Sequence, residues 1–282
     1  MADCTGLRFK KTLESRGITD ADVDENSNKK QEANHNRQYY SNLLMHSEWL
    51  VDVPTNFATE WFMVPSPLGR RSLIVASERY TYCFTKNGYR KMGFQSLLPN
   101  GGGSTRRSQD ETILDCIFCE KTKTFYMLDC IQWAGQQIGE NEFTFRHFWL
   151  QSRVEELDLD KVSAKNQYRF VLLPKYSCDI ASIEAALNTP TDYEIDGLLF
   201  YCNEAFYVPG LTPLVGWLKP FMVREILNVQ HLPEKFRPPM AGPNKDHEST
   251  TAEFIEDFNA KIAAEVAKKK VSPKNSQEKM KE

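Results

Sequence analysis

One pattern recurs between residues 41 and 232: short segments rich in β-branched and aromatic residues, separated by clusters of Pro, Gly or Asn. Segments of this kind predict strands, and the clusters between them predict turns. The predicted strands lie at residues 61–64, 71–75, 81–84, 112–118, 124–130, 144–149, 168–172 and 197–201. A domain that holds so many short strands has a large antiparallel sheet component.

Helical segments are fewer and lie between or after the strands. They are expected around residues 37–47, 131–139, 179–188 and 222–227. The chain shows no internal repeat, so solenoid and propeller architectures are not indicated. The predicted fold class is therefore α+β, with largely antiparallel sheets and flanking helices.

The segment at residues 1–40 differs sharply in composition from the region that follows it. It is poor in large apolar side chains and rich in Asp, Asn, Lys, Glu and Gln. Such a segment cannot bury enough apolar surface to offset the entropy lost on ordering, so it is predicted to be mostly disordered. This leaves residues 41–232 as the globular domain.

The C-terminal segment, residues 233–282, is expected to form a Pro-rich linker, a short amphipathic helix and a charged tail. Thr250 and Glu253 have the spacing of a capping box, which predicts the start of the helix. Apolar residues then recur every four positions, at Phe254, Phe258, Ile262 and Val266. The sequence leaves two alternatives open: the helix docks on the domain, or it stays solvated.

The charge and cysteine content exclude several classes of protein. The net charge is -3 and the isoelectric point is about 6.0, so any contact with a nucleic acid must be local. The seven cysteines are scattered, which fits a reducing compartment, and Cys116 and Cys119 have no second pair at zinc spacing. No metal or cofactor is expected. No apolar run approaches the roughly 18 residues of a membrane span, so no membrane association is expected.

Charged residues near the predicted strand ends are the first candidates for a site. Gly69 permits a tight turn and close ligand approach, and Arg71 follows it where a phosphate is within reach. An ordinary hairpin with a basic tip fits the same residues. Lys86 precedes an Asn-Gly turn and is placed for a phosphate contact, although an ordinary surface lysine fits the same position. Asp115 and Asp129 each end an apolar run, either as hydrogen-bond hubs or as site residues.

Two tryptophans from distant parts of the chain, Trp49 and Trp217, are the second candidate pair. A pair of indoles can clamp a flat, positively charged base, and guanine methylated at N7 is such a base. The alternative is that both tryptophans belong to the core. Composition by itself does not decide between the two interpretations.

Several motifs, taken together and in order, resemble the cap-binding domain of snurportin. They lie at residues 44–54, 73–77, 94–101, 112–117, 195–201 and 212–220. The resemblance implies an RNA-cap-binding nuclear import adaptor. Such an adaptor recognises the 2,2,7-trimethylguanosine (m3G) cap of spliceosomal U small nuclear RNAs and carries the ribonucleoprotein (snRNP) into the nucleus. It therefore implies an m3G-capped snRNP as partner and shuttling between nucleus and cytoplasm.

The family also resembles in fold the GTP-binding domain of mRNA guanylyltransferases and other nucleotidyltransferases. Those enzymes carry Lys-x-Asp-Gly at the first turn, where the lysine is the nucleophile, whereas this chain has Ser66-Pro67-Leu68-Gly69. Their Leu-Asp-Gly-Glu motif is Leu114-Asp115-Cys116-Ile117 here, while Asp196-Gly197-Leu198 is retained. We therefore expect no catalytic residue and no enzymatic activity, although a nucleotide-shaped pocket is expected to persist.

Carried over from the family, the two tryptophans contact the methylated base. Trp217 is expected to stack on the base, and Trp49 to pack near its dimethylamino edge and the adjacent nucleotide. Ser47, in the same motif as Trp49, is placed to hydrogen-bond the cap.

The resemblance assigns the remaining contacts to Lys86 and Arg71 at the triphosphate bridge, and to Ser66 in the wall of the pocket. Dimethylation at N2 removes two N–H donors, so an apolar wall without a carboxylate is expected to favour the trimethylated cap over 7-methylguanosine (m7G). Each methyl group buried adds about 0.8 kcal/mol.

The chain departs from the family at its N-terminal segment. The family carries a helix there with a dense Arg/Lys run that binds importin-β, but in residues 1–40 the only basic pairs are Lys10-Lys11 and Lys29-Lys30, among acids. Residues 1–40 therefore do not show the basic helix through which the family binds importin-β. An export receptor that recognises a leucine-rich signal is a further partner implied by the family. The alternatives are a cap-binding regulator without a transport role and a residual guanylyltransferase-like nucleotide binder.

Overall fold

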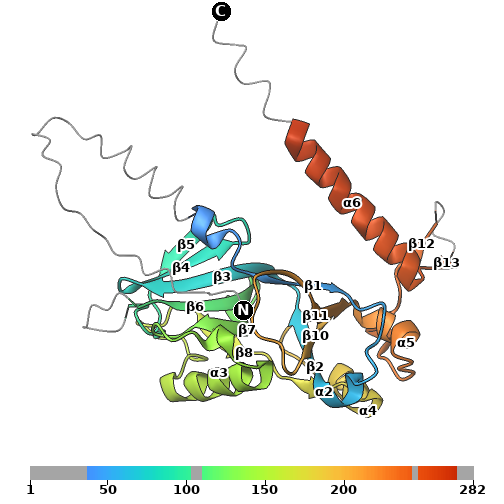
Figure 1. Ribbon diagram of the computed structural model, residues 1–282, viewed down its shortest axis with the longest axis horizontal. Helices are drawn as coiled ribbons and strands as arrows, with labels where there is room; N and C mark the ends of the chain where they lie inside the picture. Colours follow the sequence, from blue (N-terminus) through green and yellow to red (C-terminus); the bar gives the residue numbers. More distant parts are fainter. Residues whose placement is uncertain (1–36, 103–109, 243–246, 272–282) are drawn as a thin grey trace, which may run out of the picture.

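The computed structural model describes residues 37–102, 110–242 and 247–271 (Figure 1). Most of the predicted disordered segment and most of the charged tail therefore lie outside the described residues. Residues 37–40 form a helical turn at the start of the described part.

Two sheets form the body of the domain. The five-stranded sheet has the order β1-β11-β10-β2-β9, and the six-stranded sheet has the order β5-β4-β3-β6-β7-β8. Neighbouring strands are antiparallel except for the pairs β1–β11 and β7–β8. The predicted fold class is thus confirmed.

The strands of the five-stranded sheet are β1 (Met45–Trp49), β2 (Trp61–Pro67), β9 (Tyr176–Ser177), β10 (Ile195–Cys202) and β11 (Gly210–Leu218). Those of the six-stranded sheet are β3 (Arg70–Ser77), β4 (Tyr80–Thr85), β5 (Arg90–Phe94), β6 (Thr112–Cys119), β7 (Thr124–Gln132) and β8 (Arg169–Leu172). A short ribbon of β12 (Met240–Ala241) and β13 (His247–Glu248) follows. The α-helices are α2 (Phe57–Glu60), α3 (Phe143–Leu157), α4 (Ile180–Asn188), α5 (Val223–Ile226) and α6 (Thr251–Val271). Short 3-10 turns are η1 (Ile138–Glu140), η2 (Pro220–Met222) and η3 (Glu234–Phe236).

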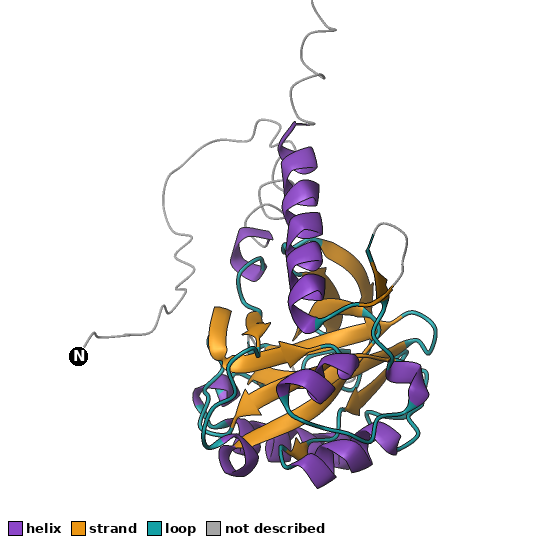
Figure 2. Ribbon diagram, turned by 90° about the vertical axis from the view of Figure 1, so that its right-hand side faces the viewer, coloured by secondary structure: helices purple, strands orange, loops and turns teal. Residues whose placement is uncertain are grey.

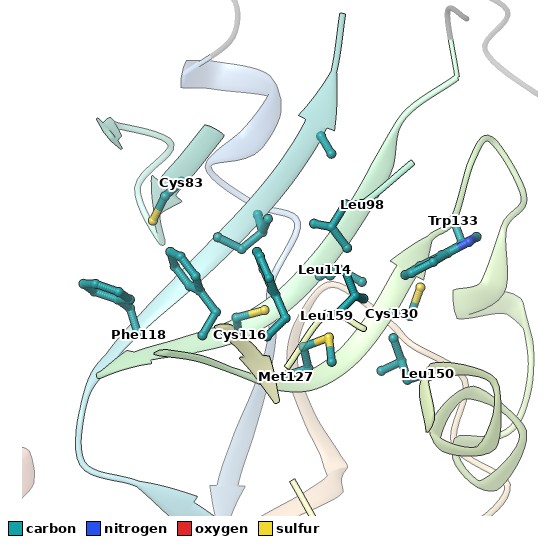
Figure 3. Close-up of a cluster of buried hydrophobic side chains, with 14 of the residues drawn as sticks. Cys83, Leu98, Leu114, Cys116, Phe118, Met127, Cys130, Trp133, Leu150 and Leu159 are labelled. Atoms are coloured by element: carbon teal, nitrogen blue, oxygen red, sulfur yellow. The ribbon is translucent and has the colours of Figure 1, made fainter. Parts of the chain in front are cut away.

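The core has layers because β6 is buried on both faces along its whole length. Successive side chains of a strand point to opposite faces. Accordingly, Cys116 packs toward α3 together with Leu150, whereas Ile117 packs toward the five-stranded sheet together with Leu199. Figure 3 shows Cys116 and Leu150 in the first of these clusters. The second cluster joins the two sheets and thereby fixes β10 and β11 against β6.

Cys116 and Cys119 both lie in β6 and belong to clusters on opposite faces of it. Two residues three apart in a strand point in opposite directions, so they cannot bind one metal ion together. Over the described residues, no group of three or more His, Cys, Asp or Glu side chains gathers where a metal could bind. None of the described helices is long and apolar enough to cross a membrane.

The strand predicted at residues 144–149 is wrong, because these residues form part of the helix α3. The buried residues of α3 are Phe143, Arg146, His147 and Leu150, which have helical spacing. Phe145 and Phe148 point to solvent instead. The aromatic residues on both faces of the helix produced the strand-like pattern.

The other helix predictions had mixed outcomes. The helices at 179–188 and 222–227 are confirmed as α4 and α5. The prediction at 37–47 is wrong beyond residue 40, because residues 45–49 form β1. The prediction at 131–139 is also wrong: β7 continues to Gln132, and only the 3-10 turn η1 begins before residue 139.

The capping box at the start of α6 is confirmed. The backbone N–H of Glu253 donates to Thr250 Oγ1 at 3.3 Å, and the backbone N–H of Thr250 donates to Glu253 Oε2 at 2.9 Å. The helix docks on the domain through its first turns and then projects away from both sheets (Figures 1 and 2). The two alternatives that the sequence left open therefore apply to different parts of α6.

Candidate functional site

A cavity of about 760 Å³ opens where β1, β2, β10 and β11 of the five-stranded sheet meet β3 and β6 of the six-stranded sheet. Five of the six residues predicted for the site line it: Ser47, Trp49, Ser66, Arg71 and Trp217. They come from both sheets and from segments up to 170 residues apart (47 to 217). The fold therefore gathers residues that the sequence analysis had grouped only through a resemblance.

The two tryptophans lie side by side because β1 and β11 pair in parallel with Trp49 opposite Trp217. This register depends on a bulge. Ser47 pairs with Thr212, but Glu48 pairs with Gly216, so residues 213–215 leave the ladder. Pro213 lies among them and has no N–H to donate. Beyond the bulge, the N–H of Leu50 donates to the Trp217 carbonyl at 3.1 Å and restores the pairing.

The indole of Trp217 is held from two sides. A Cβ atom placed on Gly197 of β10 would lie 2.1 Å from the Trp217 ring, so the ring occupies the space that only glycine leaves open. Lys219 Nζ lies 5.6 Å from the ring centroid and donates to Asp196 Oδ1 at 2.7 Å. The retained Asp-Gly motif thus supports Trp217: the aspartate holds Lys219, and the glycine admits the ring.

Arg71 joins three elements at the cavity. Its Nε and Nη2 donate to the two carboxylate oxygens of Asp115 at 2.5 and 2.6 Å, and Nη2 also donates to the Met45 carbonyl at 3.1 Å. Tyr207 donates to Asp115 Oδ2 at 2.7 Å and accepts from the N–H of Met45 at 2.9 Å. These bonds fasten the start of β1 to β3 and β6, and so position Ser47 and Trp49.

Arg71 stays positively charged although most of its side chain is buried. Burial lowers the pKa of a guanidinium, but the adjacent Asp115 carboxylate outweighs this and raises the pKa of Arg71 above its ordinary value. The Arg71 side chain is 24% exposed and lines the cavity, while Asp115 is fully buried. The site therefore offers a fixed cation whose carboxylate partner is turned away from solvent.

Asp129, the second aspartate singled out in the sequence, forms a closed ion pair. Arg146 Nε and Nη2 donate to its carboxylate oxygens at 2.7 and 2.8 Å, and Arg146 Nη1 donates to the carbonyls of Asn141 and Ala205. Both aspartates are thus hydrogen-bond hubs. Of their two arginine partners, Arg71 lines the cavity and Arg146 does not.

Lys86 is the predicted site residue that the structure does not bring to the cavity wall. It is exposed and follows β4 at the turn. It is close enough to His46 of β1 to influence it: the pKa of His46 is lowered first by burial and then by the charges of Arg71 and Lys86, against an opposing effect of Asp115. Lys86 is therefore near His46 and outside the cavity wall.

The wall of the cavity includes two carboxylate residues, Glu48 and Asp196, so the expectation of a wall without a carboxylate is wrong. Asp196 is held by Lys219 and is therefore compensated. Glu48 is exposed on the edge strand β1. The charges that face the cavity are thus of both signs.

Ser66, which the resemblance places where nucleotidyltransferases have their lysine, is buried in β2 and pairs with Gly197 of β10. No lysine is found among the described residues that line the cavity.

Sequence reasoning missed part of the wall. Ile117 of β6 and Leu199 of β10 line the cavity, and so do Phe258 and Asn259 of α6. Ile117 and Leu199 were recognisable as strand residues, but whether their side chains face the cavity depends on how the two sheets pack. Phe258 was recognised as part of an apolar stripe, and the open question was what that stripe contacts.

A strand-built cavity lined by two indoles and a partly exposed arginine suits a flat base that carries phosphate groups. The family model of the snurportin-1 m3G cap-binding domain matches residues 43–220. The chain belongs to this family, and cap binding is the function that membership supports.

Solved structures of similar fold include DNA ligase domains. The ligase domain of Mycobacterium tuberculosis LigD is 10% identical, with a TM-score of 0.42, 62% of this chain covered and 57% of that chain. Mycobacterial DNA ligase D complexed with ATP and MES is 11% identical, with a TM-score of 0.45, 64% of this chain covered and 60% of that chain. A Lig E DNA ligase is 12% identical, with a TM-score of 0.42, 62% of this chain covered and 67% of that chain. The match spans less than two thirds of the first two of these chains.

Proposed function

We propose that this protein binds the 2,2,7-trimethylguanosine cap of spliceosomal U snRNAs in the cavity between Trp49 and Trp217, and that it acts as an adaptor for snRNP import into the nucleus. The observation that carries the proposal is the register of β1 and β11, which sets the two indoles opposite each other at one cavity. Membership of the snurportin cap-binding family supports the choice of ligand.

The chemistry of the wall suits such a cap. The N7-methylated base is positively charged and stacks on the Trp217 indole more strongly than a neutral base does. The N2 methyl groups pack near Trp49, where each buried carbon contributes about 0.8 kcal/mol. Arg71 supplies a cation for the triphosphate bridge, and Lys86 supplies another from outside the cavity wall. Ser47 and Ser66 are the hydroxyl groups of the wall.

Selectivity against the m7G cap then depends on apolar contact, because an N2 dimethylamino group has no N–H to donate. The two carboxylate residues of the wall do not remove this preference. Lys219 engages Asp196, and Glu48 is exposed to water, which competes for any hydrogen bond it makes. We expect a preference of a few kcal/mol for the trimethylated cap, since two methyl groups and their packing contribute on that scale.

The proposed function includes no nucleotidyl transfer, because Ser66 stands where the enzymes have their lysine. The partners we propose are an m3G-capped snRNP, importin-β and an export receptor, with shuttling between nucleus and cytoplasm. A cap-binding regulator without transport is the second candidate, favoured by the sparse basic residues in the segment 1–40.

The test is a fluorescence titration of the full chain with trimethylguanosine cap dinucleotide and, in parallel, its m7G analogue. We expect quenching by the trimethylated cap at much lower concentration, and its loss in Trp217→Ala. Trp149→Phe, which changes an indole in α3 away from the cavity, is the matched control and is expected to bind normally. Equal binding of both caps, or undiminished binding by Trp217→Ala, would refute the proposal. Binding to purified importin-β then separates the adaptor from the regulator.

A further inference from the structure

Helix α6 is anchored to the domain at its first turns. Its start is fixed by the N–H of Thr251, which donates to Glu225 Oε2 of α5 at 2.9 Å. One turn later, the Phe254 ring lies 5.3 Å from that of Phe221 and 6.4 Å from that of Trp49, both edge-to-face. An aromatic cluster therefore ties this helix directly to one of the two tryptophans of the cavity.

Phe258 extends this cluster to the cavity itself. Its ring centroid lies 5.4 Å from that of Trp49, with an interplanar angle of 89°. This is the favoured edge-to-face geometry, which contributes about 0.5–1.5 kcal/mol beyond the burial of area. Phe258 is 40% exposed and, together with Asn259, lines the cavity. Phe258 thus contacts Trp49 and also faces the space where a ligand would enter.

The apolar stripe of α6 is divided at this point. Phe254 packs against the core, whereas Ile262 and Val266 are 47% and 48% exposed and do not line the cavity. They follow Phe258 in α6, which projects away from the domain toward its C-terminal end (Figure 1). Phe258 is therefore the residue at which the stripe changes from packing on the domain to facing solvent.

We infer that α6 is part of the nucleotide site: Phe258 closes the wall beside Trp49 and holds its indole in place, and Asn259 presents an amide to the polar part of the ligand. This inference rests on the proposed function, and it adds to the site a helix that lies beyond the 43–220 region matched by the family model. The ligand class is a methylated guanine nucleotide with its phosphate bridge.

The physical effect of Phe258 is preorganisation. Trp49 lies on β1, an edge strand of its sheet, so no further strand supports it on one side. Its described ring contacts are with Phe254 and Phe258, both from α6. An indole already fixed in the free protein loses less conformational freedom when the ligand binds, and this increases affinity. Removing Phe258 loosens the indole and also opens the wall.

The experiment compares Phe258→Ala with Ile262→Ala in the full chain. Ile262 lies one turn further along the same stripe and is the matched control. Cap affinity is measured by quenching of tryptophan fluorescence, and circular dichroism checks that both variants are folded. We expect Phe258→Ala to weaken binding of trimethylguanosine cap dinucleotide about tenfold, the scale of one interface anchor, and Ile262→Ala to bind like the wild type. Equal affinity of Phe258→Ala and the wild type would overturn the inference.

A second measurement needs no variant. Amide hydrogen exchange of the wild-type chain is followed with and without the cap dinucleotide, and we expect slower exchange at residues 254–262 in the bound state. No protection of this segment, while residues 47–50 are protected, would overturn the role of α6 and leave the proposed function intact. A wild-type protein that binds no cap would instead refute the proposed function.

Discussion

Asp115 and Asp129 face each other directly across β6 and β7, and each holds an arginine by two hydrogen bonds. The two ion pairs nevertheless have different surroundings. Arg146 is fully buried, and three protein groups accept its hydrogen bonds, whereas Arg71 is 24% exposed at the cavity. We call them the closed pair (Asp129–Arg146) and the open pair (Asp115–Arg71).

The difference shows how one kind of interaction serves two purposes. In the closed pair, Arg146 also donates hydrogen bonds to the carbonyls of Asn141 and Ala205, so its N–H groups are used within the protein. In the open pair, the described bonds of Arg71 use Nε and Nη2. Since a guanidinium has five N–H donors, the described bonds of Arg71 do not use all of them. Position relative to the cavity, and not chemistry, distinguishes the two pairs.

The largest effect is expected from breaking the closed pair. Arg146→Met leaves the Asp129 carboxylate buried without its cation, which lowers the free energy of unfolding by about 3–5 kcal/mol. Urea unfolding followed by circular dichroism measures the change. Cap affinity of the folded fraction is expected to stay at the wild-type value, and a loss of less than about 1 kcal/mol would contradict the distinction between the pairs.

Breaking the open pair is expected to cost less stability but to reduce binding. Arg71→Met lowers the free energy of unfolding by about 1–3 kcal/mol, because water reaches the site and partly solvates Asp115. Loss of one charge-assisted contact to the phosphate bridge weakens cap affinity about tenfold. The same urea and fluorescence measurements apply. If Arg71→Met and Arg146→Met had the same effect on affinity, the comparison would fail.

The smallest effect concerns His46, which lies beside the open pair. Burial, followed by Arg71 and Lys86, lowers the pKa of His46 in the folded protein. The unfolded chain therefore binds this proton more readily, and stability falls as the pH drops through the unfolded value of about 6.5. His46→Gln is expected to make the decrease in unfolding free energy between about pH 7 and pH 5 shallower. An unchanged slope would show that the pKa of His46 is not lowered in the folded protein.

The sequence predicts much of the six-stranded sheet, because strands such as β6 and β7 are apolar runs buried on both faces or nearly so. It does not predict β1, β5 or β11. The first two are short, partly polar strands at sheet edges, where one side faces solvent. β11 contains Pro213 and two glycines, which normally end a strand, and the bulge that accommodates them is set by pairing with β1.

The candidate site was predictable to a similar degree. The resemblance located Trp49, Trp217, Ser47, Ser66 and Arg71, and these five lie at one cavity. The contribution of α6 was not predictable, because it depends on where a helix beyond a Pro-rich linker docks. The ion pair of Arg71 was not predictable for a related reason: sequence spacing does not show that the Asp115 carboxylate lies within hydrogen-bond distance of Arg71.

The fit of Trp217 against Gly197 limits how this site can vary over evolutionary time. Any side chain at position 197 would occupy the volume of the indole ring, with a first carbon only 2.1 Å from it. A smaller residue at position 217 would make room but would remove the aromatic face. Either substitution made alone impairs the site, so residues 197 and 217 can change only together. The path between two working pairs passes through an intermediate protein with an impaired site.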